Sequence, residues 1–292
     1  MRAVAAPEPF SLLLPVYAGD DGGFVERAFR SATTEQVRPP AEVVIVRDGP
    51  VPDAVATTLA AIVDGSPIPV TLVELPRNLG LARALQAGLA ACRHDIVARM
   101  DADDVSLPER FERQVPLLEE GVDVVGCALA EMGTDERTVL GVRSLPLTQS
   151  EILRSARFHT PFHHPTVVFR RAAVERVGGY QDLPALEDYW LWVRLLARGA
   201  RGANLAEPLL LYRVDAGAFE RRGGWRLAKA EVELQRRMRR IGFTTRWQFV
   251  RNVVVRGGWR LVPVSLRRPL YRLVFRRTPA TPAAPVGAPP TR

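Results

Sequence analysis

The chain has 292 residues, 47% of them hydrophobic, and a formal net charge of +8. That much apolar material is enough for one large globular domain, or for one domain with an appendage. No apolar stretch approaches the roughly 18 to 20 residues that span a bilayer, and the run Phe10 to Tyr17 is too short for a signal peptide, so we expect a cytoplasmic protein. Cys92 and Cys127 lie far apart in apolar surroundings, which favours two buried, unpaired thiols.

The first half of the chain alternates between strand-like and helix-like patterns. Apolar runs typical of strands lie at Phe10–Val16, Glu42–Val46, Val70–Glu74, Asp95–Met100 and Val122–Cys127, and helical patterns lie near 23–34, 53–63, 80–92 and 108–120. Four consecutive strand–helix units predict an α/β fold with a mainly parallel sheet and helices on both faces. Ligands of such sheets bind beyond the carboxyl ends of the strands, so the residues that follow each strand are the first candidates for a site.

The fourth strand end is the most unusual, because it carries three carboxylates, Asp101, Asp103 and Asp104. Crowded carboxylates repel one another unless a cation lies between them, and Mg²⁺ or Mn²⁺ is commonly held by one or two carboxylates together with substrate phosphates. The cluster therefore predicts a metal-bridged phosphate substrate; the alternative is a solvated acidic turn before the helix that starts near Pro108. Neither G-x-G-x-x-G nor a P-loop follows the first strand, so a bound nucleotide would depend on this metal rather than on a glycine-rich cradle.

Five segments resemble, in this order, the motifs of the family-2 inverting glycosyltransferases with a GT-A fold, and most of all the bacterial enzymes that extend exopolysaccharides and other surface glycans. The segments are Ser11–Tyr17, Glu42–Pro50, Arg77–Gly80, Ala98–Asp104 and Glu187–Trp192. The resemblance covers residues 8–215 and implies a GT-A (Rossmann-like) catalytic domain over 1–215, with a nucleotide-sugar half at 8–130 and an acceptor half at 131–215. It also implies transfer of a sugar, with inversion, from a nucleotide diphosphate donor, in the first place a UDP-sugar, to a hydroxyl of a glycan or lipid-linked saccharide, assisted by Mg²⁺ or Mn²⁺.

The resemblance assigns the nucleotide base to the first two strand ends. Tyr17 matches the aromatic residue that stacks near the base, and Asp48 matches the aspartate that hydrogen-bonds a pyrimidine. Arg47 stands where related chains often have a second aspartate, which would alter the contacts around the nucleotide. The alternatives are a core tyrosine at Tyr17 and a turn-forming Asp-Gly at Asp48.

The same resemblance assigns the rest of the donor to the later strand ends. Asp101 matches the acid that approaches the ribose and Asp103 the metal ligand, although Asp104 could take that last role. Three further polar residues could reach the ribose or the phosphates: Arg77, Asn78 and Arg99. For the two arginines, the alternative is an ordinary surface position on a loop.

An inverting transfer is a single displacement, so one base must take the acceptor's proton on the face opposite the departing diphosphate. Glu187 and Asp188 begin an apolar helix, whose dipole favours the ionised carboxylate that a base must be. Successive residues of a helix diverge by about 100°, so only one of the two can face the acceptor squarely. The resemblance gives the base to Asp188 and leaves Glu187 to position the acceptor or hold a loop; the alternative is that both are ordinary helix-terminal charges.

Three of the four histidines lie in the segment Phe158–Pro165. A zinc site is disfavoured, because Pro161 and Pro165 break any helix that could pair these histidines and no cysteine accompanies them. Related glycosyltransferases carry a His-Pro element before a strand, so the resemblance places His164 in the wall of the acceptor or donor-sugar pocket.

The C-terminal third is strongly basic, since residues 201–292 carry 20 Lys+Arg against 5 Asp+Glu, whereas residues 1–200 carry 20 against 27. Within it we expect a basic helical extension over 216–277 and a disordered proline-rich tail over 278–292. Apolar residues mixed with eight arginines over 249–277 suit an anionic membrane surface, which would make the protein peripheral on the inner face of the plasma membrane. The alternative is a helical cap packed on the catalytic domain.

Two other functions compete with sugar transfer. A nucleotidyltransferase that makes sugar nucleotides would need a glycine- and arginine-rich loop after the first strand, which Pro15-Val-Tyr17 does not supply. A non-catalytic protein that binds nucleic acid or membrane through its arginines would have no use for acidic clusters in a cleft, and those clusters would repel a polyanion. We therefore expect no nucleic-acid partner.

Overall fold

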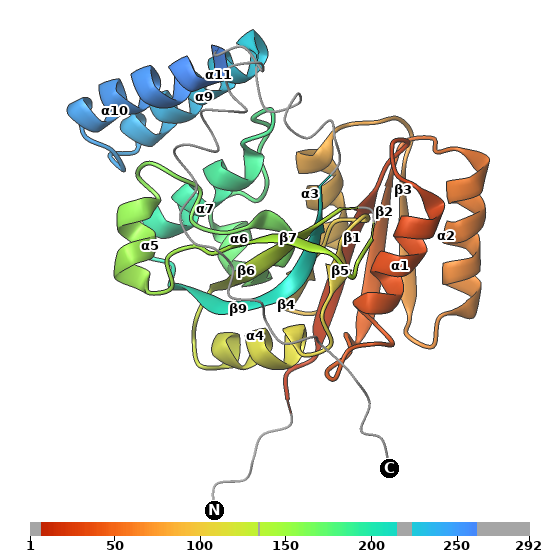
Figure 1. The fold of residues 1–292 in the computed structure, drawn as a ribbon. Coiled ribbons are helices and arrows are strands. Elements are labelled where there is room, and N and C mark those ends of the chain that lie inside the picture. Colours follow the sequence, from red (N-terminus) through yellow and green to blue (C-terminus); the bar gives the residue numbers. More distant parts are fainter. Residues whose placement is uncertain (1–6, 134, 215–223, 262–292) are drawn as a thin grey trace, which may run out of the picture.

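The computed structural model describes residues 7–133, 135–214 and 224–261 (Figure 1). Its strands are β1 (Phe10–Val16), β2 (Glu42–Asp48), β3 (Val70–Leu75), β4 (Ile96–Arg99), β5 (Val105–Ser106), β6 (Val124–Met132), β7 (Val139–Arg143), β8 (Val168–Arg170) and β9 (Gly202–Arg213). Its α-helices are α1 (Gly22–Ser31), α2 (Asp53–Gly65), α3 (Leu81–Ala91), α4 (Arg110–Glu119), α5 (Gln149–Ser155), α6 (Arg171–Arg176), α7 (Glu187–Ala197), α9 (Trp225–Arg240), α10 (Arg246–Asn252) and α11 (Gly258–Leu261). A 3₁₀ turn at His164–Thr166 and a π-helical turn at Val253–Gly257 join some of them. The predicted alternation of four strands and four helices at the N-terminus is confirmed.

The strands form one curved sheet in the order β3-β2-β1-β4-β8-β6-β9-β5, with β7 paired to β6. β1, β2, β3 and β4 are parallel, as consecutive strand–helix units require. Beyond β4 the sheet is mixed, since β8 is antiparallel to both β4 and β6 whereas β9 is parallel to β6. The chain runs outward from β1 to β3 and then returns to β4 on the other side of β1. This switch of direction between β1 and β4 marks the edge at which open α/β sheets bind ligands.

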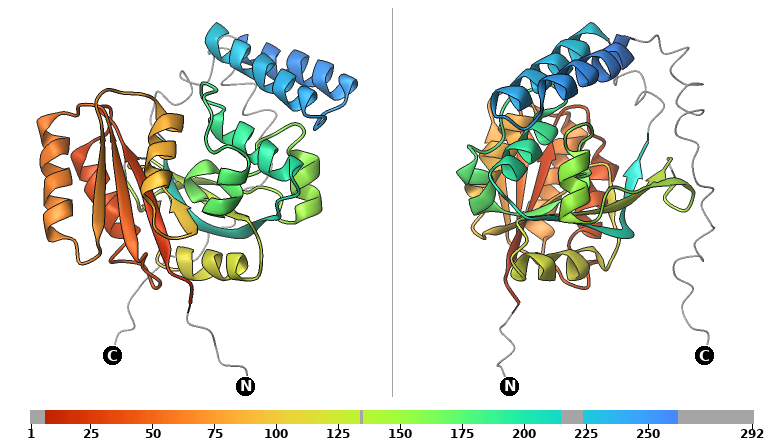
Figure 2. Two further views of the ribbon diagram at one scale, coloured as in Figure 1. Left: turned by 180° about the vertical axis from the view of Figure 1, so that it is seen from behind. Right: turned by 90° about the vertical axis from the view of Figure 1, so that its left-hand side faces the viewer.

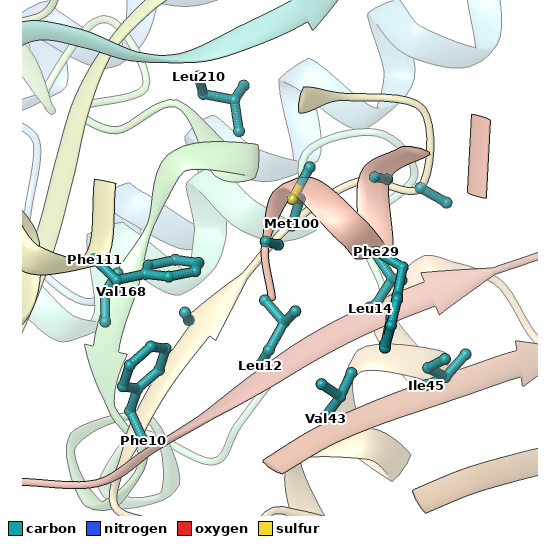
Figure 3. Packing of buried hydrophobic residues seen from close by; sticks show 14 of the residues in the cluster. Phe10, Leu12, Leu14, Phe29, Val43, Ile45, Met100, Phe111, Val168 and Leu210 are labelled. Carbon is teal, nitrogen blue, oxygen red and sulfur yellow. The ribbon is translucent and has the colours of Figure 1, made fainter. Parts of the chain in front are cut away.

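Helices cover both faces of the sheet, as predicted. Successive side chains of a strand point to opposite faces, so Leu12 and Leu14 of β1 pack on the side of α1, α2 and α4, while Leu13 packs on the side of α3. Figure 3 shows the first of these cores, where Phe29 and Phe111 meet the β1 side chains. The second core continues across α5, α6 and α7. Both cysteines are buried in this framework and are free thiols, as expected.

Helices α9 to α11 form a C-terminal hairpin, residues 225–261, on the outer side of α7 (Figure 2). Leu234 and Met238 of α9 are fully buried in a small core with Trp190 and Val193 of α7. This part of the predicted basic extension therefore packs as a helical cap. Residues 216–223 and 262–277 of the predicted extension, and the predicted disordered tail over 278–292, lie outside the described residues. No helix within the described ranges is long and apolar enough to cross a bilayer.

Candidate active site

The carboxyl ends of β1, β2, β3 and β4 surround a cleft of about 440 Å³, which we call the strand-end cleft. It is lined by Pro15 and Val16 at the end of β1 and by Tyr17 and Asp20 after it, by Asp48 of β2, by Asn78, Gly80, Leu81 and Ala84, by Asp101, Ala102 and Asp103 after β4, and by Tyr212 of β9. Parallel strands end at one edge, so side chains far apart in sequence converge there. Five of the predicted donor residues meet in this cleft: Tyr17, Asp48, Asn78, Asp101 and Asp103.

Asp48 fixes the loop that follows β3. Its Oδ1 accepts the backbone N–H of Leu79 at 2.7 Å and its Oδ2 accepts that of Gly80 at 3.0 Å. Gly49 has a φ of 87°, and a Cβ there would lie 2.4 Å from the backbone nitrogen of Asn78, so a glycine is needed where the two loops approach. Each carboxylate oxygen accepts more than one hydrogen bond. Asp48 can therefore hold the loop and still accept an N–H from a ligand.

Tyr17 and Arg77 are both exposed, but of these two predicted donor residues only Tyr17 lines the strand-end cleft. Tyr17 is 49% exposed, so the alternative of a core tyrosine is wrong. Arg77 is exposed on the loop after β3 and is not among the residues that line the strand-end cleft. Of the polar residues after β3, Asn78 is the one that faces the cleft.

Besides Asp48, the carboxylates of Asp20, Asp101 and Asp103 line the cleft, whereas Asp104 faces inward. Asp104 is 1% exposed, and its Oδ1 accepts the backbone N–H of Arg213 at 3.0 Å. It therefore ties the turn after β4 to the end of β9. Burial raises the pKa of Asp103 to about 6 and that of Asp20 to about 7, and repulsion from the neighbouring carboxylates adds to both shifts. A cation bound between these groups would relieve that repulsion.

The donor set of the cleft fits a hard divalent cation. Asp101 and Asp103 offer carboxylate oxygens, the ligands that Mg²⁺ and Mn²⁺ prefer. Within the described ranges, no three His, Cys, Asp or Glu side chains are grouped closely enough to hold a metal by themselves. An ion at Asp101 and Asp103 would therefore take its remaining ligands from substrate oxygens and water, the usual arrangement for Mg²⁺ with phosphates.

Arg99 lies beneath the cleft and not on its surface. Its side chain is 1% exposed and forms an ion pair with Asp101. The Nε and Nη1 atoms have no hydrogen-bond partner in the described part of the chain. The positive charge of Arg99 also opposes the upward pKa shifts of Glu187 and Asp188. Arg99 is thus a buried counter-charge for several acidic groups, and the alternative of a surface arginine is wrong.

A second pocket, of about 420 Å³, opens beside the strand-end cleft and shares Asp101 and Tyr212 with it. We call it the α7 pocket, because Asp188 and Tyr189 at the start of α7 line it. Its other walls come from β6, β7, the loop before β8, the loop before α7 and the C-terminal hairpin. They carry Leu129, Arg143, Thr160, Phe162, His163, His164, Pro165, Ala185, Leu186, Leu227, Arg256 and Arg260.

The two acids that begin α7 face different spaces. Asp188 lines the α7 pocket, whereas Glu187 lines a third pocket together with Leu183 and Arg226. The Oδ1 of Asp188 accepts the backbone N–H of Tyr189 at 2.6 Å, which fixes the carboxylate at the helix N-terminus. Burial raises the pKa of Asp188, and burial together with the charge of Asp188 raises the pKa of Glu187. A carboxylate with a raised pKa is a better proton acceptor than one in water.

The histidines of the α7 pocket are uncharged. Burial and the nearby Arg99 lower the pKa of His164 well below its usual range, and its Nε2 lies 3.0 Å from the Oη of Tyr180. Burial and Arg143 lower the pKa of His163 to about 3. Both imidazoles therefore act at neutral pH as polar hydrogen-bonding groups and not as cations.

Some residues of the two pockets were not expected from the sequence. Asp20 lines the strand-end cleft, and its position in Gly19-Asp20-Asp21 directly after β1 is a signal that would have identified it. Arg143, Arg256 and Arg260 carry no comparable signal. They converge on the α7 pocket from β7 and from the hairpin only in the folded chain.

Comparison with known proteins connects these features to a family. The model of "Glycosyl transferase family 2" matches residues 11–178. The amylovoran biosynthesis glycosyltransferase AmsE of Erwinia amylovora is 37% identical over 268 residues, which are 90% of this chain and 97% of that protein. A UDP-Gal:α-D-GlcNAc-diphosphoundecaprenol β-1,3-galactosyltransferase of Escherichia coli is 32% identical over 272 residues, which are 92% of this chain and 97% of that protein.

Solved structures share the fold at lower identity. The mannosyltransferase PcManGT of Pyrobaculum calidifontis, in complex with GDP-Man and Mn²⁺, matches with a TM-score of 0.64 and 19% identity over 92% of this chain and 76% of that one. Staphylococcus aureus TarS 1–349 in complex with UDP-GlcNAc matches with a TM-score of 0.62 and 14% identity over the same shares. These neighbours confirm the predicted GT-A fold. The match of the family model to more than half of the chain, together with relatives that align over nearly their whole length, shows that this protein is a glycosyltransferase and belongs to glycosyl transferase family 2.

Proposed function

We propose that the protein transfers a sugar from a nucleotide diphosphate in the strand-end cleft to an acceptor hydroxyl in the α7 pocket, with inversion at the anomeric carbon. The observation that carries this proposal is the meeting of the two pockets at Asp101, with Asp103 in the first and Asp188 in the second. A single displacement needs the leaving group and the base on opposite faces of the transferred sugar. Two adjoining pockets, each with a carboxylate, can hold the leaving diphosphate on one face of the sugar and the base on the other.

The nucleotide occupies the strand-end cleft. The exposed ring of Tyr17 stacks on the base, and Asp48, which has lone pairs to spare beyond its two loop contacts, accepts an N–H of the base. Uracil carries such an N–H between its two carbonyl groups, which favours a UDP-sugar. Asp101 accepts a hydrogen bond from the ribose, and Asn78, on the loop after β3, meets the ribose and the phosphates.

Asp103, together with Asp101, would hold Mg²⁺ or Mn²⁺, and such an ion would supply the positive charge that neutralises a departing diphosphate. The raised pKa of Asp103, caused by burial and by Asp101, supports a cation there. The mannosyltransferase of similar fold was solved with Mn²⁺. Asp104 is engaged with Arg213 and keeps the turn in place.

Asp188 is the base. Its carboxylate takes the proton of the acceptor hydroxyl while the hydroxyl oxygen attacks the anomeric carbon of the donor sugar. The bond from that carbon to the diphosphate oxygen breaks in the same step, and its electron pair leaves with the diphosphate. His164, which is neutral, hydrogen-bonds the sugars from the wall of the pocket, and Glu187 supports the loop before α7 from the third pocket.

The acceptor is a glycan or lipid-linked saccharide used in bacterial surface polysaccharide synthesis. The names of the relatives support this, because one acts in amylovoran biosynthesis and another on a diphosphoundecaprenol-linked sugar. The hairpin supports a peripheral position on the inner face of the plasma membrane, since Trp247, Val250 and Val254 are exposed near the exposed Arg246 and Arg251. Apolar and cationic side chains mixed on one helical surface suit an anionic bilayer.

A thermal-shift screen of nucleotide sugars with and without Mn²⁺ tests the proposal. A UDP-sugar should raise the melting temperature when Mn²⁺ is present and should lose most of that effect in EDTA, because a ligand that binds only the folded chain stabilises it. Asp103→Asn should lose the metal-dependent part of the shift. A protein that no nucleotide sugar stabilises, with or without metal, would contradict the assignment of the strand-end cleft.

A further inference from the structure

The walls of the α7 pocket carry charges of both signs on different elements. The carboxylates of Asp101 and Asp188 come from the end of β4 and the start of α7. The guanidinium groups of Arg143, Arg256 and Arg260 come from β7 and the C-terminal hairpin. A hydroxyl acceptor needs the base Asp188, but a neutral sugar gives no reason for three arginines in the lining of one pocket.

We propose that the arginine-lined part of the α7 pocket binds a phosphate or diphosphate ester on the acceptor, with Arg256 and Arg260 as its main ligands and Arg143 as a further cation of the same pocket. The inference rests on the proposed function, because it names the anionic group that the acceptor of that reaction carries. Arginine suits this role, since its planar fork matches phosphate oxygens bidentately and keeps its charge at any physiological pH.

Arg256 is held in place before any ligand arrives. Its Nε and Nη2 donate to the two carboxylate oxygens of Glu231 at 2.6 and 3.1 Å, and its Nη1 donates to the carbonyl of Phe158 at 2.6 Å. The guanidinium also lies 5.3 Å from the ring centroid of Tyr189, the residue that follows the proposed catalytic base Asp188. A guanidinium group has five N–H bonds, so two remain after these three contacts. A guanidinium group that is already held in position and has unused N–H donors is a preorganised anion site.

Arg260 stands one turn further along the same helical segment and shares the same counter-charge. Its Nη2 lies 3.6 Å from Glu231 Oε2, and Glu231 is fully buried. The guanidinium groups of Arg256 and Arg260 thus both lie against Glu231. A phosphate between the two guanidinium groups would be attracted to both positive charges.

The position of these two arginines also suits a phosphate that is joined to a lipid. Asn252, Arg256 and Arg260 follow the spacing of four residues that keeps side chains on one face of a helix, and this face turns toward α9 and the pocket. Trp247, Val250 and Val254 are exposed, and their spacing from Asn252 places them on the opposite face of the same helical segment. One helical segment therefore has cations on the side of the pocket and apolar side chains on its outer side. A lipid phosphate has the matching arrangement, with a charged head group at one end and an apolar chain at the other.

The test compares ligands that differ in one group. The α-D-GlcNAc diphosphate ester of pentanol, the matching monophosphate ester and the neutral pentyl glycoside are titrated into the full-length enzyme with UDP and Mn²⁺ present, so that the strand-end cleft is filled. Pentyl diphosphate without sugar serves as a fourth ligand, because it does not depend on the choice of saccharide. We expect the diphosphates to bind about ten-fold more tightly than the neutral glycoside, in keeping with charge-assisted hydrogen bonds to arginine.

Arg260→Ala should abolish most of this preference, and Arg143→Gln should reduce it by less. Arg240→Ala is the matched control, because Arg240 is an exposed cation of the same hairpin that does not line the α7 pocket; it should keep the wild-type preference. Equal binding of the diphosphate ester and the neutral glycoside by the wild type would overturn the proposal, as would a full preference in Arg260→Ala, and so would failure of every diphosphate to bind.

Two further measurements separate the possible failures. Binding of a UDP-sugar with Mn²⁺ is measured in each variant; if it persists while the diphosphate preference is absent, the phosphate site is wrong and the proposed transferase function stands. If no donor binds, the proposed function itself fails. Esters with longer alkyl chains distinguish a lipid contact from a phosphate contact, because an affinity that follows chain length but not the number of phosphates would overturn the arginine assignment in favour of the outer apolar face.

Discussion

The strand-end cleft and the α7 pocket are neighbours, but the chain builds them in different ways. The cleft takes nearly all of its lining from residues 15–103, which lie at or after the ends of parallel strands or at the start of α3. The α7 pocket takes its lining from residues 101–260, and its arginines arrive from β7 and from a hairpin packed behind α7. Backbone topology therefore determines the first site, whereas packing between distant elements determines the second. We expect variants to separate donor functions from acceptor functions along this line.

Asp188→Asn should give the largest separation between donor binding and sugar transfer. The amide cannot take the acceptor's proton, so transfer should fall by about 10²- to 10⁴-fold, the usual contribution of general base catalysis. Affinity for the donor should remain, because Asp188 lines the α7 pocket and not the strand-end cleft. Steady-state transfer assays and donor titrations on the same preparation measure both. Glu187→Gln is the matched comparison, and a larger loss of transfer in that variant would reassign the base.

Asp103→Asn should instead weaken the binding of the donor. We expect the variant to lose at least about ten-fold in Mn²⁺-dependent donor affinity, since one of two carboxylate ligands is gone. Asp104→Asn should instead lower the melting temperature, because Asp104 is buried and accepts the backbone N–H of Arg213. Titrations of UDP-sugar with and without Mn²⁺, together with thermal unfolding, distinguish the two. Unchanged metal dependence in Asp103→Asn would remove the cluster from the donor site.

A fall in pH should lower kcat but increase the contribution of Asp188 to the free energy of unfolding. Burial raises the pKa of Asp188 in the folded chain, so its base form is lost as the pH falls from neutrality, and kcat should fall with it. The same shift means that the folded chain binds protons more tightly than the unfolded chain does at this group. Its contribution to the free energy of unfolding therefore increases as the pH falls through the raised pKa. Parallel measurements of kcat and the melting temperature across this range check both signs, with Asp188→Asn as the control in which this contribution to stability is absent. A wild-type kcat that is flat across the range would contradict Asp188 as the base.

The smallest expected effect tests the hairpin. Leu234 is fully buried between α9 and α7, so Leu234→Ala should lower the free energy of unfolding by about 2–5 kcal/mol. It should raise the KM for the acceptor several-fold while leaving the KM for the donor unchanged, because the hairpin contributes Leu227, Arg256 and Arg260 to the α7 pocket and no residue to the strand-end cleft's lining. Val250→Ala, at an exposed position of the hairpin, is the comparison. An equal rise in both KM values would show that the two sites are not separable.

The sequence predicts the strand-end cleft well because its information is local. Strands such as Phe10–Val16 appear as apolar runs, and the polar residue after each run falls at the ligand-binding edge once the strands are parallel. Tyr17, Asp48 and Asp103 are therefore identifiable from the order of residues alone. The family resemblance added their expected roles, which remain proposals.

Other features depend on side-chain direction, which the sequence does not carry. Asp103 and Asp104 are adjacent residues of the same type, yet Asp103 faces the cleft and Asp104 is 1% exposed. Arg99 was expected near the phosphates, but β4 is a central strand and its side chain is enclosed beneath Asp101. Arg256 and Arg260 looked like members of a basic tail, because their approach to α7 depends on how the hairpin packs.

The small core that joins α9 to α7 has a consequence for how such enzymes diversify. Leu234 and Met238 contact Trp190 and Val193, so the hairpin is attached to the same helix that begins with Asp188. A hairpin grafted from a relative could change which acceptor is chosen while the donor preference is inherited unchanged, provided that the graft keeps these apolar partners. Exchange of residues 225–261 is in this sense a route by which one donor chemistry can be redirected to a new glycan.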